Sequence, residues 1–259
     1  MVGCGKGLGG AVAIRFARAG YTIAAFARSQ ASLDAVGADL AAVSGTSHGF
    51  YAMDATVKAE VDAAFARVAA ELGPVSVLVY NVSESPESMQ QTVLDINPDD
   101  FTRSFNINAL GALLCTQAVL PGMLASPGSV VSPGSKGVAK RGTILYTSTT
   151  GAFRSMAKTA RLSAGKMALR ALSQSVAKEY GKQGVHAVHL RMDCTYESAR
   201  NKDVFEAMGM GDMFQRATAA NKLASIDDLA ETFYTLHMQS PMAWTNELDL
   251  RPYTEDCKL

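Results

Sequence analysis

Short apolar segments typical of buried strands alternate with longer amphipathic segments typical of helices along almost the whole chain. The strand-like segments are residues 21–27, 49–53, 75–80, 142–148, 184–190 and 246–250. The helix-like segments are residues 8–19, 31–43, 57–72, 98–125, 159–181 and 226–238. Strands that alternate with helices pair in parallel and are covered on both faces. We therefore expect an α/β fold with a doubly wound, mainly parallel sheet in three layers, α/β/α.

No change of composition divides the chain, so we expect one domain over residues 1–259. Residues 126–141 are rich in Ser, Gly and Pro, and we interpret them as an exposed insertion rather than a lid. Residues 195–225 carry no motif, and we expect them to cover the substrate. Only Met1 and Val2 precede a glycine-rich turn. The first strand is then almost absent, and we expect that the chain as given starts late.

Charge and cysteine content argue against several kinds of partner. Basic and acidic residues both number 24, so the formal net charge is zero and the chain has no overall electrostatic bias toward nucleic acid. We find no stretch that is long and apolar enough to span a bilayer, and expect no membrane partner. The four cysteines show no CxxC spacing and the four histidines no HExxH pattern. We therefore expect free thiols, no metal and a small-molecule substrate.

The glycine-rich turn at residues 2–10, VGCGKGLGG, predicts a dinucleotide-binding site. Glycines such as Gly3, Gly7 and Gly9 permit positive φ, close approach of the backbone to a pyrophosphate, and tight helix packing. The helix that begins at Leu8 offers free N–H groups and the positive end of its dipole to phosphates. A strand follows this helix at the distance expected of a Rossmann fold.

The residues after the strand expected at 21–27, which is the second strand when the nearly absent first one is counted, favour NADP(H) over NAD(H). An NAD site usually has an acid there for the ribose 2′-hydroxyl, whereas this chain has Ala27-Arg28-Ser29. An arginine such as Arg28 can pair with a 2′-phosphate in bidentate fashion. Lys6 in the glycine turn adds a second positive charge to the same region.

With these motifs, nearly the whole chain resembles the short-chain dehydrogenase/reductase family. Gly3, Gly7 and Gly9 match the family's glycine motif. Asp54, after the strand expected at 49–53, matches the acid that contacts the adenine amine. Tyr80-Asn81-Val82 stands where the family has Asn-Ala-Gly, whose asparagine supports the cofactor and the central sheet. The resemblance implies hydride transfer between a nicotinamide cofactor and a carbonyl or alcohol substrate.

Three further residues match the family's catalytic group, and a fourth does not. Asn108 matches its asparagine, and Ser148 matches its serine, with Thr149 as the close alternative. Lys166 matches the lysine of the YxxxK motif, which holds the nicotinamide ribose and lowers the pKa of the tyrosine. Leu162 stands in place of that tyrosine, the proton donor, and has neither donor nor acceptor.

A second departure is Asp193-Cys194, where the family has a Pro-Gly that contacts the nicotinamide end. The chain thus resembles a divergent branch that lacks the catalytic tyrosine. Other candidate proton donors are Tyr146, Ser163 and His189, which we interpret as packing or local hydrogen-bonding residues. The least strained substitute is Ser148, backed by water or by the Lys166 ammonium.

Three functions follow from this combination. The leading hypothesis is an NADP(H)-dependent oxidoreductase. We expect it to be slow, because the missing tyrosine is the general acid, and general acid catalysis raises reaction rates about a hundred- to ten-thousandfold. The alternative is a non-catalytic NADP(H)-binding sensor or scaffold. An isomerase or lyase on the same fold is the third, since fold alone does not decide activity.

Assembly and location follow from the family and from the C-terminus. In the family, helices equivalent to residues 98–125 and 159–181 form a four-helix interface, so we expect a homodimer or homotetramer. The ending Cys257-Lys258-Leu259 resembles the peroxisomal tripeptide of which SKL is the type. We expect a peroxisomal or related location; if the ending is accidental, the location is cytoplasmic.

Overall fold

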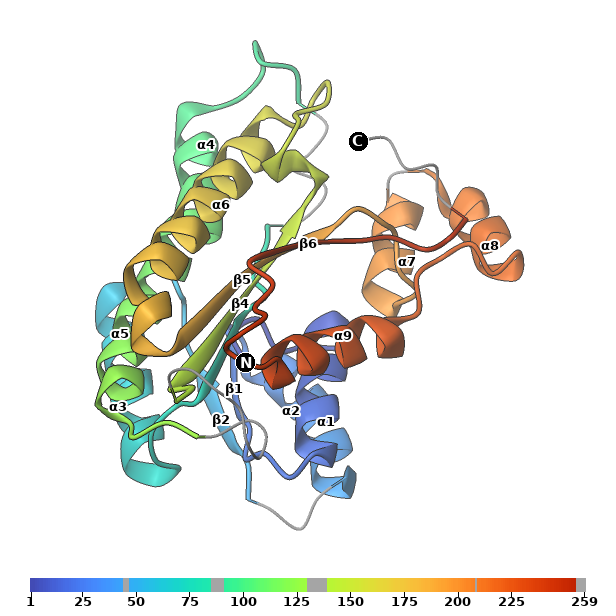
Figure 1. The fold of residues 1–259 in the computed structure, drawn as a ribbon. Coiled ribbons are helices and arrows are strands. Elements are labelled where there is room, and N and C mark those ends of the chain that lie inside the picture. The colour runs from blue at the N-terminus through green and yellow to red at the C-terminus, as the bar shows by residue number, and fades with distance from the viewer. Residues whose placement is uncertain (44–46, 85–90, 130–138, 208, 255–259) are drawn as a thin grey trace.

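The structure is a computed structural model that describes residues 1–43, 47–84, 91–129, 139–207 and 209–254. Figure 1 shows a central sheet with helices on both of its faces. The strands are β1 (Ala24–Ala27), β2 (Gly49–Ala52), β3 (Val77–Tyr80), β4 (Gly142–Thr149), β5 (Val185–Met192) and β6 (Glu247–Leu250). β1 pairs with β2, and β3 to β6 pair in sequence order, all in parallel. The expected three-layer α/β fold is confirmed.

Val2 joins the two ladders of the sheet. It forms isolated parallel bridges to Phe26 of β1 and to Tyr80 of β3. Its N–H donates to the Val79 carbonyl oxygen at 2.9 Å, and the Met1 ammonium donates to the Ala24 carbonyl oxygen at 2.7 Å. The strand expected between β1 and β3 is thus represented by one bridging residue. Beside it, a cavity of about 200 Å³ lies between the two strands.

The helices form two layers that enclose the sheet. One layer holds α1 (Leu8–Arg18), α2 (Gln30–Val43) and α9 (Ile226–Met238). The other holds α3 (Lys58–Glu71), α4 (Pro98–Phe105), α5 (Gly111–Ala125) and α6 (Ala160–Tyr180). Each layer packs on its own apolar core, because successive side chains of a strand point to opposite faces. On β4, for example, Tyr146 belongs to the core beneath α5 and Leu145 to the core beneath α1.

The expected helix over 98–125 contains an irregular turn. A π-helical segment, η2 (Asn106–Leu110), separates α4 from α5. The expectation that no stretch is long and apolar enough to cross a membrane is wrong for Pro98–Ala125, by length and composition. An 18-residue window of this segment has a mean hydropathy of 1.5, and 56 % of it is buried inside the protein. Such burial is what the core helix of an α/β domain also shows.

The remaining elements are short. The 3₁₀ turns η3 (Thr150–Ala152) and η4 (Gly181–Gln183) follow β4 and α6. Two helices, α7 (Ala199–Ala207) and α8 (Gly211–Ala219), lie in the region expected to cover the substrate. Within the expected insertion at 126–141, Ser129 pairs with Lys140 in an antiparallel bridge. Residues 130–138 lie outside the described part of the chain.

Candidate dinucleotide-binding and active site

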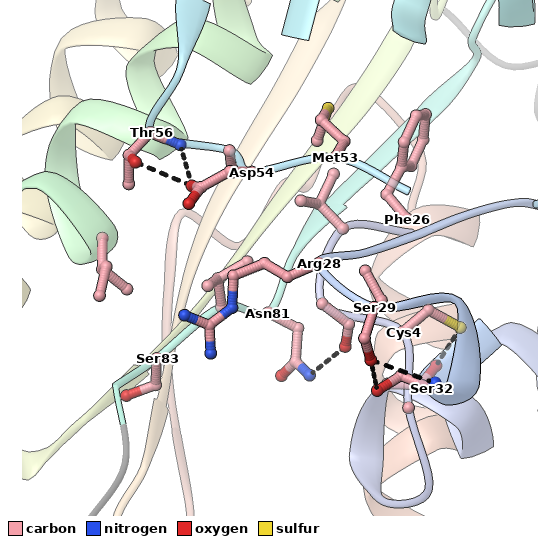
Figure 2. A pocket seen from close by; sticks show the side chains of 18 of the residues that line it. Cys4, Phe26, Arg28, Ser29, Ser32, Met53, Asp54, Thr56, Asn81 and Ser83 are labelled. Carbon is pink, nitrogen blue, oxygen red and sulfur yellow. Dashed lines mark hydrogen bonds between the residues drawn. The ribbon is translucent and has the colours of Figure 1, made fainter. Parts of the chain in front are cut away.

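A cavity of about 940 Å³ opens where β1, β2 and β3 end (Figure 2). Doubly wound sheets bind their ligands at this edge. All but one of the expected cofactor-binding residues line it: Gly3, Lys6, Gly7, Leu8, Gly9, Arg28, Asp54 and Asn81. Lys166 is the exception. The structure therefore brings the adenosine and phosphate side of the expected site together in one cleft.

The glycine turn is closely packed on one side and open on the other. A Cβ atom on Gly3 would lie 2.7 Å from the Asn81 carbonyl oxygen, and Gly3 has φ of +81°. A Cβ on Gly9 would lie 2.2 Å from the Gly3 carbonyl oxygen. Gly7, the N-cap of α1, has no atom within 4 Å of the same position and provides no capping side chain. The N-terminus of α1 thus faces open space, which fits a pyrophosphate.

Positive and hydroxyl side chains gather where β1 ends. Figure 2 shows Arg28 projecting into the cavity, with Ser29 and Ser32 beside the turn into α2. The two hydroxyl oxygens lie 2.9 Å apart, and the Ser32 N–H donates to Ser29 Oγ at 3.3 Å. Ser32 was not predicted as a cavity residue, although it lies three positions after Ser29, whose position before α2 is a recognisable capping signal. This group fits a ribose 2′-phosphate.

Asp54 and Asn81 hold the neighbouring backbone in place. The Asp54 carboxylate accepts from the N–H and the hydroxyl of Thr56, both at 2.8 Å. The Asn81 side-chain amide donates to the Gly3 carbonyl oxygen at 3.3 Å, and its backbone N–H donates to Val2 at 2.9 Å. Asn81 therefore ties the end of β3 to the glycine turn, as the family resemblance implies.

Asn108 lies in the π-helical turn and is fully buried. Its amide donates to the Ser104 carbonyl oxygen at 2.9 Å, while its Oδ1 has no hydrogen-bond partner among the described residues. A Cβ on Gly165 would lie only 2.8 Å from the Asn108 Cβ, so α6 packs directly against this turn. Single π-turns inside helices are frequent at functional sites.

Lys166 is also buried, with its side chain directed at two strand ends. Its ammonium donates to the carbonyl oxygens of Val82, at 3.3 Å, and Thr147, at 3.0 Å. Burial lowers the pKa of Lys166 to about 7, opposed by the nearby Glu84 carboxylate. Leu162, one helical turn earlier, is buried too. Neither residue lines the 940 Å³ cavity, and nor do Asn108 and Ser148.

The structure distinguishes the two candidate hydroxyls at the end of β4. Ser148 is completely buried on the face shared with Tyr146, and its Oγ has no hydrogen-bond partner in the described chain. Thr149 is partly exposed, and its Oγ1 accepts from the Gly151 N–H at 3.2 Å. Thr149, the alternative from the sequence, is therefore the more accessible of the two.

The other candidate proton donors lie in packed surroundings. The Tyr146 hydroxyl lies 2.7 Å from the Thr116 hydroxyl, and burial raises the pKa of Tyr146. His189 is fully buried, and burial lowers its pKa to about 4. The Ser163 hydroxyl lies 3.2 Å from that of Thr159.

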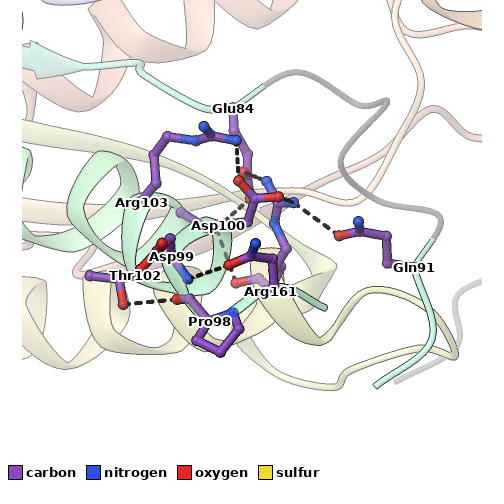
Figure 3. A network of polar contacts seen from close by, with 10 residues as sticks. Glu84, Gln91, Pro98, Asp99, Asp100, Thr102, Arg103 and Arg161 are labelled. Carbon is purple, nitrogen blue, oxygen red and sulfur yellow. Dashed lines mark hydrogen bonds and ion pairs between the residues drawn. The ribbon is translucent and has the colours of Figure 1, made fainter. Parts of the chain in front are cut away.

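A buried ion pair beside Leu162 was not anticipated from the sequence (Figure 3). Arg161 donates to the Glu84 carboxylate at 2.7 Å, and both side chains are 5 % exposed. The Ser104 hydroxyl also donates to Glu84, and Asp100 lies 3.4 Å from Arg161. The network joins the segment after β3 to α4 and α6. No local motif reveals it, because Glu84 and Arg161 are 77 residues apart.

No group of three or more His, Cys, Asp or Glu residues that could hold a metal ion occurs in the described ranges.

Comparison with known proteins identifies the family. The short chain dehydrogenase family model matches residues 1–207. An L-xylulose reductase of Mesocricetus auratus is 28 % identical over 174 residues, 66 % of each chain. A short-chain dehydrogenase/reductase of Armillaria gallica is 27 % identical over 188 residues, 71 % of this chain and 66 % of that protein. The chain thus spans slightly under two thirds of the length of these relatives.

Solved structures share the fold. The actinorhodin polyketide ketoreductase with NADPH superposes with a TM-score of 0.83 at 19 % identity, covering 98 % of this chain and 95 % of that one. An alcohol dehydrogenase from Thermococcus sibiricus, complexed with 5-hydroxy-NADP, gives 0.78 at 19 % identity, covering 100 % and 97 %. Together with the family match, these findings show that the chain belongs to the short-chain dehydrogenase/reductase family of oxidoreductases.

Proposed function

We propose that the protein is an NADP(H)-dependent oxidoreductase that transfers a hydride to or from a carbonyl or alcohol substrate. The observation that carries this proposal is the cleft at the ends of β1 to β3, where an open helix N-terminus adjoins Lys6 and Arg28. The same proposal is supported by a reductase among the relatives and by the NADP or NADPH ligands of similar solved structures.

The choice of NADP(H) over NAD(H) rests on the side chains after β1. Arg28, Ser29 and Ser32 line the cavity together, and no acid stands among residues 27–29. A 2′-phosphate brings negative charge to two basic side chains, and charge-assisted hydrogen bonds are worth about 1.5–3 kcal/mol each. An NAD ribose would leave Lys6 and Arg28 without such a partner.

The site is expected to be a slow catalyst. When bound, the nicotinamide cofactor supplies or accepts the hydride. The chain must place a proton donor at the substrate oxygen, and Leu162 has none to give. Thr149, the more accessible hydroxyl at the end of β4, would orient this oxygen, since Ser148 is fully buried. Lys166 would hold the nicotinamide ribose, and its pKa of about 7 leaves it able to exchange a proton near neutral pH.

The alternative function is a non-catalytic NADP(H) sensor or scaffold. The observation that favours it is the burial of Asn108, Leu162 and Lys166 away from the cavity. The two functions differ in one readout, which is NADPH oxidation with a panel of aldehydes and ketones. Turnover on any of them supports the oxidoreductase, and tight binding without turnover supports the sensor.

Titration calorimetry of NADPH and NADH tests the cofactor. We expect tighter binding of NADPH, and a selective loss of NADPH affinity in Arg28→Ala. Arg18→Ala, which removes an exposed arginine in the last turn of α1, is the matched control and should bind both cofactors like the wild type. Equal affinities of the wild-type protein for NADPH and NADH would overturn the assignment.

A further inference from the structure

The carboxylate of Glu84 is the centre of the buried network shown in Figure 3. The Arg161 guanidinium donates to one of its oxygens at 2.7 Å, and the Ser104 hydroxyl donates to the other. The same hydroxyl lies 3.1 Å from the Arg161 carbonyl oxygen. A carboxylate bonded at both oxygens is held in one orientation, so the negative charge of Glu84 stays beside the start of α6.

The network touches each of the segments that carry the buried part of the candidate site. Val82, two residues before Glu84, offers its carbonyl oxygen to the Lys166 ammonium at 3.3 Å. Lys166 itself is on α6, five residues after the arginine of the ion pair. The Ser104 carbonyl oxygen accepts from the Asn108 amide at 2.9 Å. One carboxylate therefore fixes the end of β3, the turn with Asn108 and the helix with Lys166 relative to one another.

The charge of Glu84 matters to Lys166 as well as its position. The ammonium is hydrogen-bonded to the carbonyl oxygens of Val82 and Thr147, which carry no net charge. Burial lowers the pKa of Lys166, and the Glu84 carboxylate opposes this effect. A buried ion pair is often no more stabilising than apolar residues of similar volume. Stability alone therefore does not account for a Glu84–Arg161 pair at this place.

The other titratable groups packed around Lys166 do not change their charge near neutral pH. Beneath α6, His189 on β5 has a pKa lowered by burial to about 4, so it is neutral above pH 5. Its register partner on β4, Tyr146, has a pKa raised by burial. Arg161 stays protonated throughout, and Asp100 of α4 lies 3.4 Å from it. The protonation of Lys166 near neutral pH is thus governed by its burial and by Glu84.

We propose that Glu84 is a positioning residue that keeps Lys166 in place as a cation, with Arg161 and Ser104 holding the carboxylate. The proposal deepens the proposed function and rests on it, because Lys166 is the residue that would hold the nicotinamide ribose there. Glu84 acts through the lysine and needs no contact of its own with cofactor or substrate.

The pKa of Lys166 is measured without any ligand, by urea unfolding between about pH 5 and pH 9. Each protein is compared with its own Lys166→Met variant, so that the contributions of other titrating groups cancel. Below the pKa of the folded lysine, the difference in unfolding free energy is constant. Above it the difference shrinks as pH rises, because the amine is neutral in the folded chain and still charged in the unfolded one. The shrinkage should begin at about pH 7 in the wild type.

Glu84→Gln should move this pH down by about 1, the effect of losing a nearby opposite charge. Glu84→Asp retains the charge and should stay close to the wild type, whereas a merely structural role would be damaged by both changes. Removing one side of a buried ion pair is strongly destabilising, so Glu84→Gln/Arg161→Met, which removes both charges, is the second variant. It also lacks the carboxylate and should show the same downward move. The matched control is Arg170→Met/Glu247→Gln, which removes a partly exposed ion pair between α6 and β6 and should change nothing.

Calorimetry with NADPH connects this pKa to the cofactor. If the charged amine holds the ribose, Glu84→Gln should weaken NADPH about tenfold at pH 8 and only about twofold at pH 6. Looser packing alone would weaken NADPH equally at both pH values.

The outcomes separate the proposal from the proposed function. An unchanged pKa of Lys166 in the variants that lack the carboxylate, or the same decrease in Glu84→Asp, would overturn the role of Glu84. A lowered pKa with no pH-dependent loss of NADPH affinity would refute the role of Lys166 in the proposed function. A wild type that does not bind NADPH would refute the proposed function, and the unfolding titration would still decide whether Glu84 keeps Lys166 charged.

Discussion

Replacing Lys140 by methionine should make the protein more stable at neutral pH. The Lys140 side chain is 4 % exposed, and its ammonium has no hydrogen-bond partner among the described residues. His186 and His237, whose pKa values are both lowered by burial, are the titratable neighbours that the ammonium affects. Methionine keeps the length of the side chain and removes the charge.

The magnitude follows from the pKa of Lys140, which burial lowers from 10.5 to about 8. Each pKa unit corresponds to about 1.4 kcal/mol, so the charged form costs about 3 kcal/mol of folding free energy. The cost is full below pH 8, where the lysine is charged in both states. It fades as pH rises toward 10.5, because folding then leaves the amine neutral while the unfolded chain still binds the proton.

Urea unfolding of wild type and Lys140→Met between pH 6.5 and 10.5 measures this difference. We expect Lys140→Met to gain about 3 kcal/mol at pH 7 and the gain to shrink with rising pH. Lys58→Met, at an exposed lysine of α3, is the control and should change stability by less than about 0.5 kcal/mol. A Lys140→Met protein no more stable than wild type at pH 7 would refute the reasoning.

Three further predictions concern activity, assembly and location. Leu162→Tyr should raise reductase activity on at least one carbonyl compound by up to about a hundredfold, because it places an acid one turn before Lys166; fast wild-type turnover that this change lowers would contradict it. Light scattering should report a dimer or tetramer at micromolar concentration, since Phe101, Phe105 and Met167 expose apolar surface on α4 and α6; a monomer would refute this. A fluorescent fusion that leaves Leu259 free should be punctate in cells, although this tripeptide lies outside the described residues; diffuse signal unchanged by deletion of Leu259 would remove the claim.

The features that sequence reasoning could bring together are those carried by short segments of the chain. The glycine turn, the strand that follows α1 and the residues after it lie within 30 positions, so spacing alone brings Gly3, Gly9 and Arg28 to one cleft. Asn81 and Asp54 were predicted from their match to the family's motifs, and each stands shortly after a strand. Parallel strands deliver such residues to the same edge of the sheet.

Features that depend on distant packing were not predicted. The π-turn at Asn108 interrupts a helix whose apolar pattern reads as continuous, because one extra residue barely disturbs the periodicity. The pairs Glu84–Arg161 and Asp193–Arg251 join segments that no local motif connects. The sequence also offered Ser148 and Thr149 as alternatives, but which of these two hydroxyls is accessible depends on how the helices cover each face of β4.

The groups buried beneath the cleft bear on whether the protein is an enzyme or a sensor. Asn108 Oδ1 and Ser148 Oγ lack partners in the described chain, and the Lys166 ammonium is held where its pKa falls to about 7. Burying these polar or charged groups without full hydrogen bonding costs folding free energy, and an apolar side chain in the same place would not carry that cost. Polar groups that cost stability in this way are typical of sites where protons move.

Lys166→Met decides between the two functions. The fold should be at least as stable, because the cost of burying the charge, about 5 kcal/mol from the pKa, exceeds the loss of two hydrogen bonds of about 1 kcal/mol each. In an enzyme, turnover should fall by more than tenfold beyond any loss of NADPH affinity. If both proteins bind NADPH and neither turns over any carbonyl compound, the lysine serves binding alone and the oxidoreductase assignment is wrong.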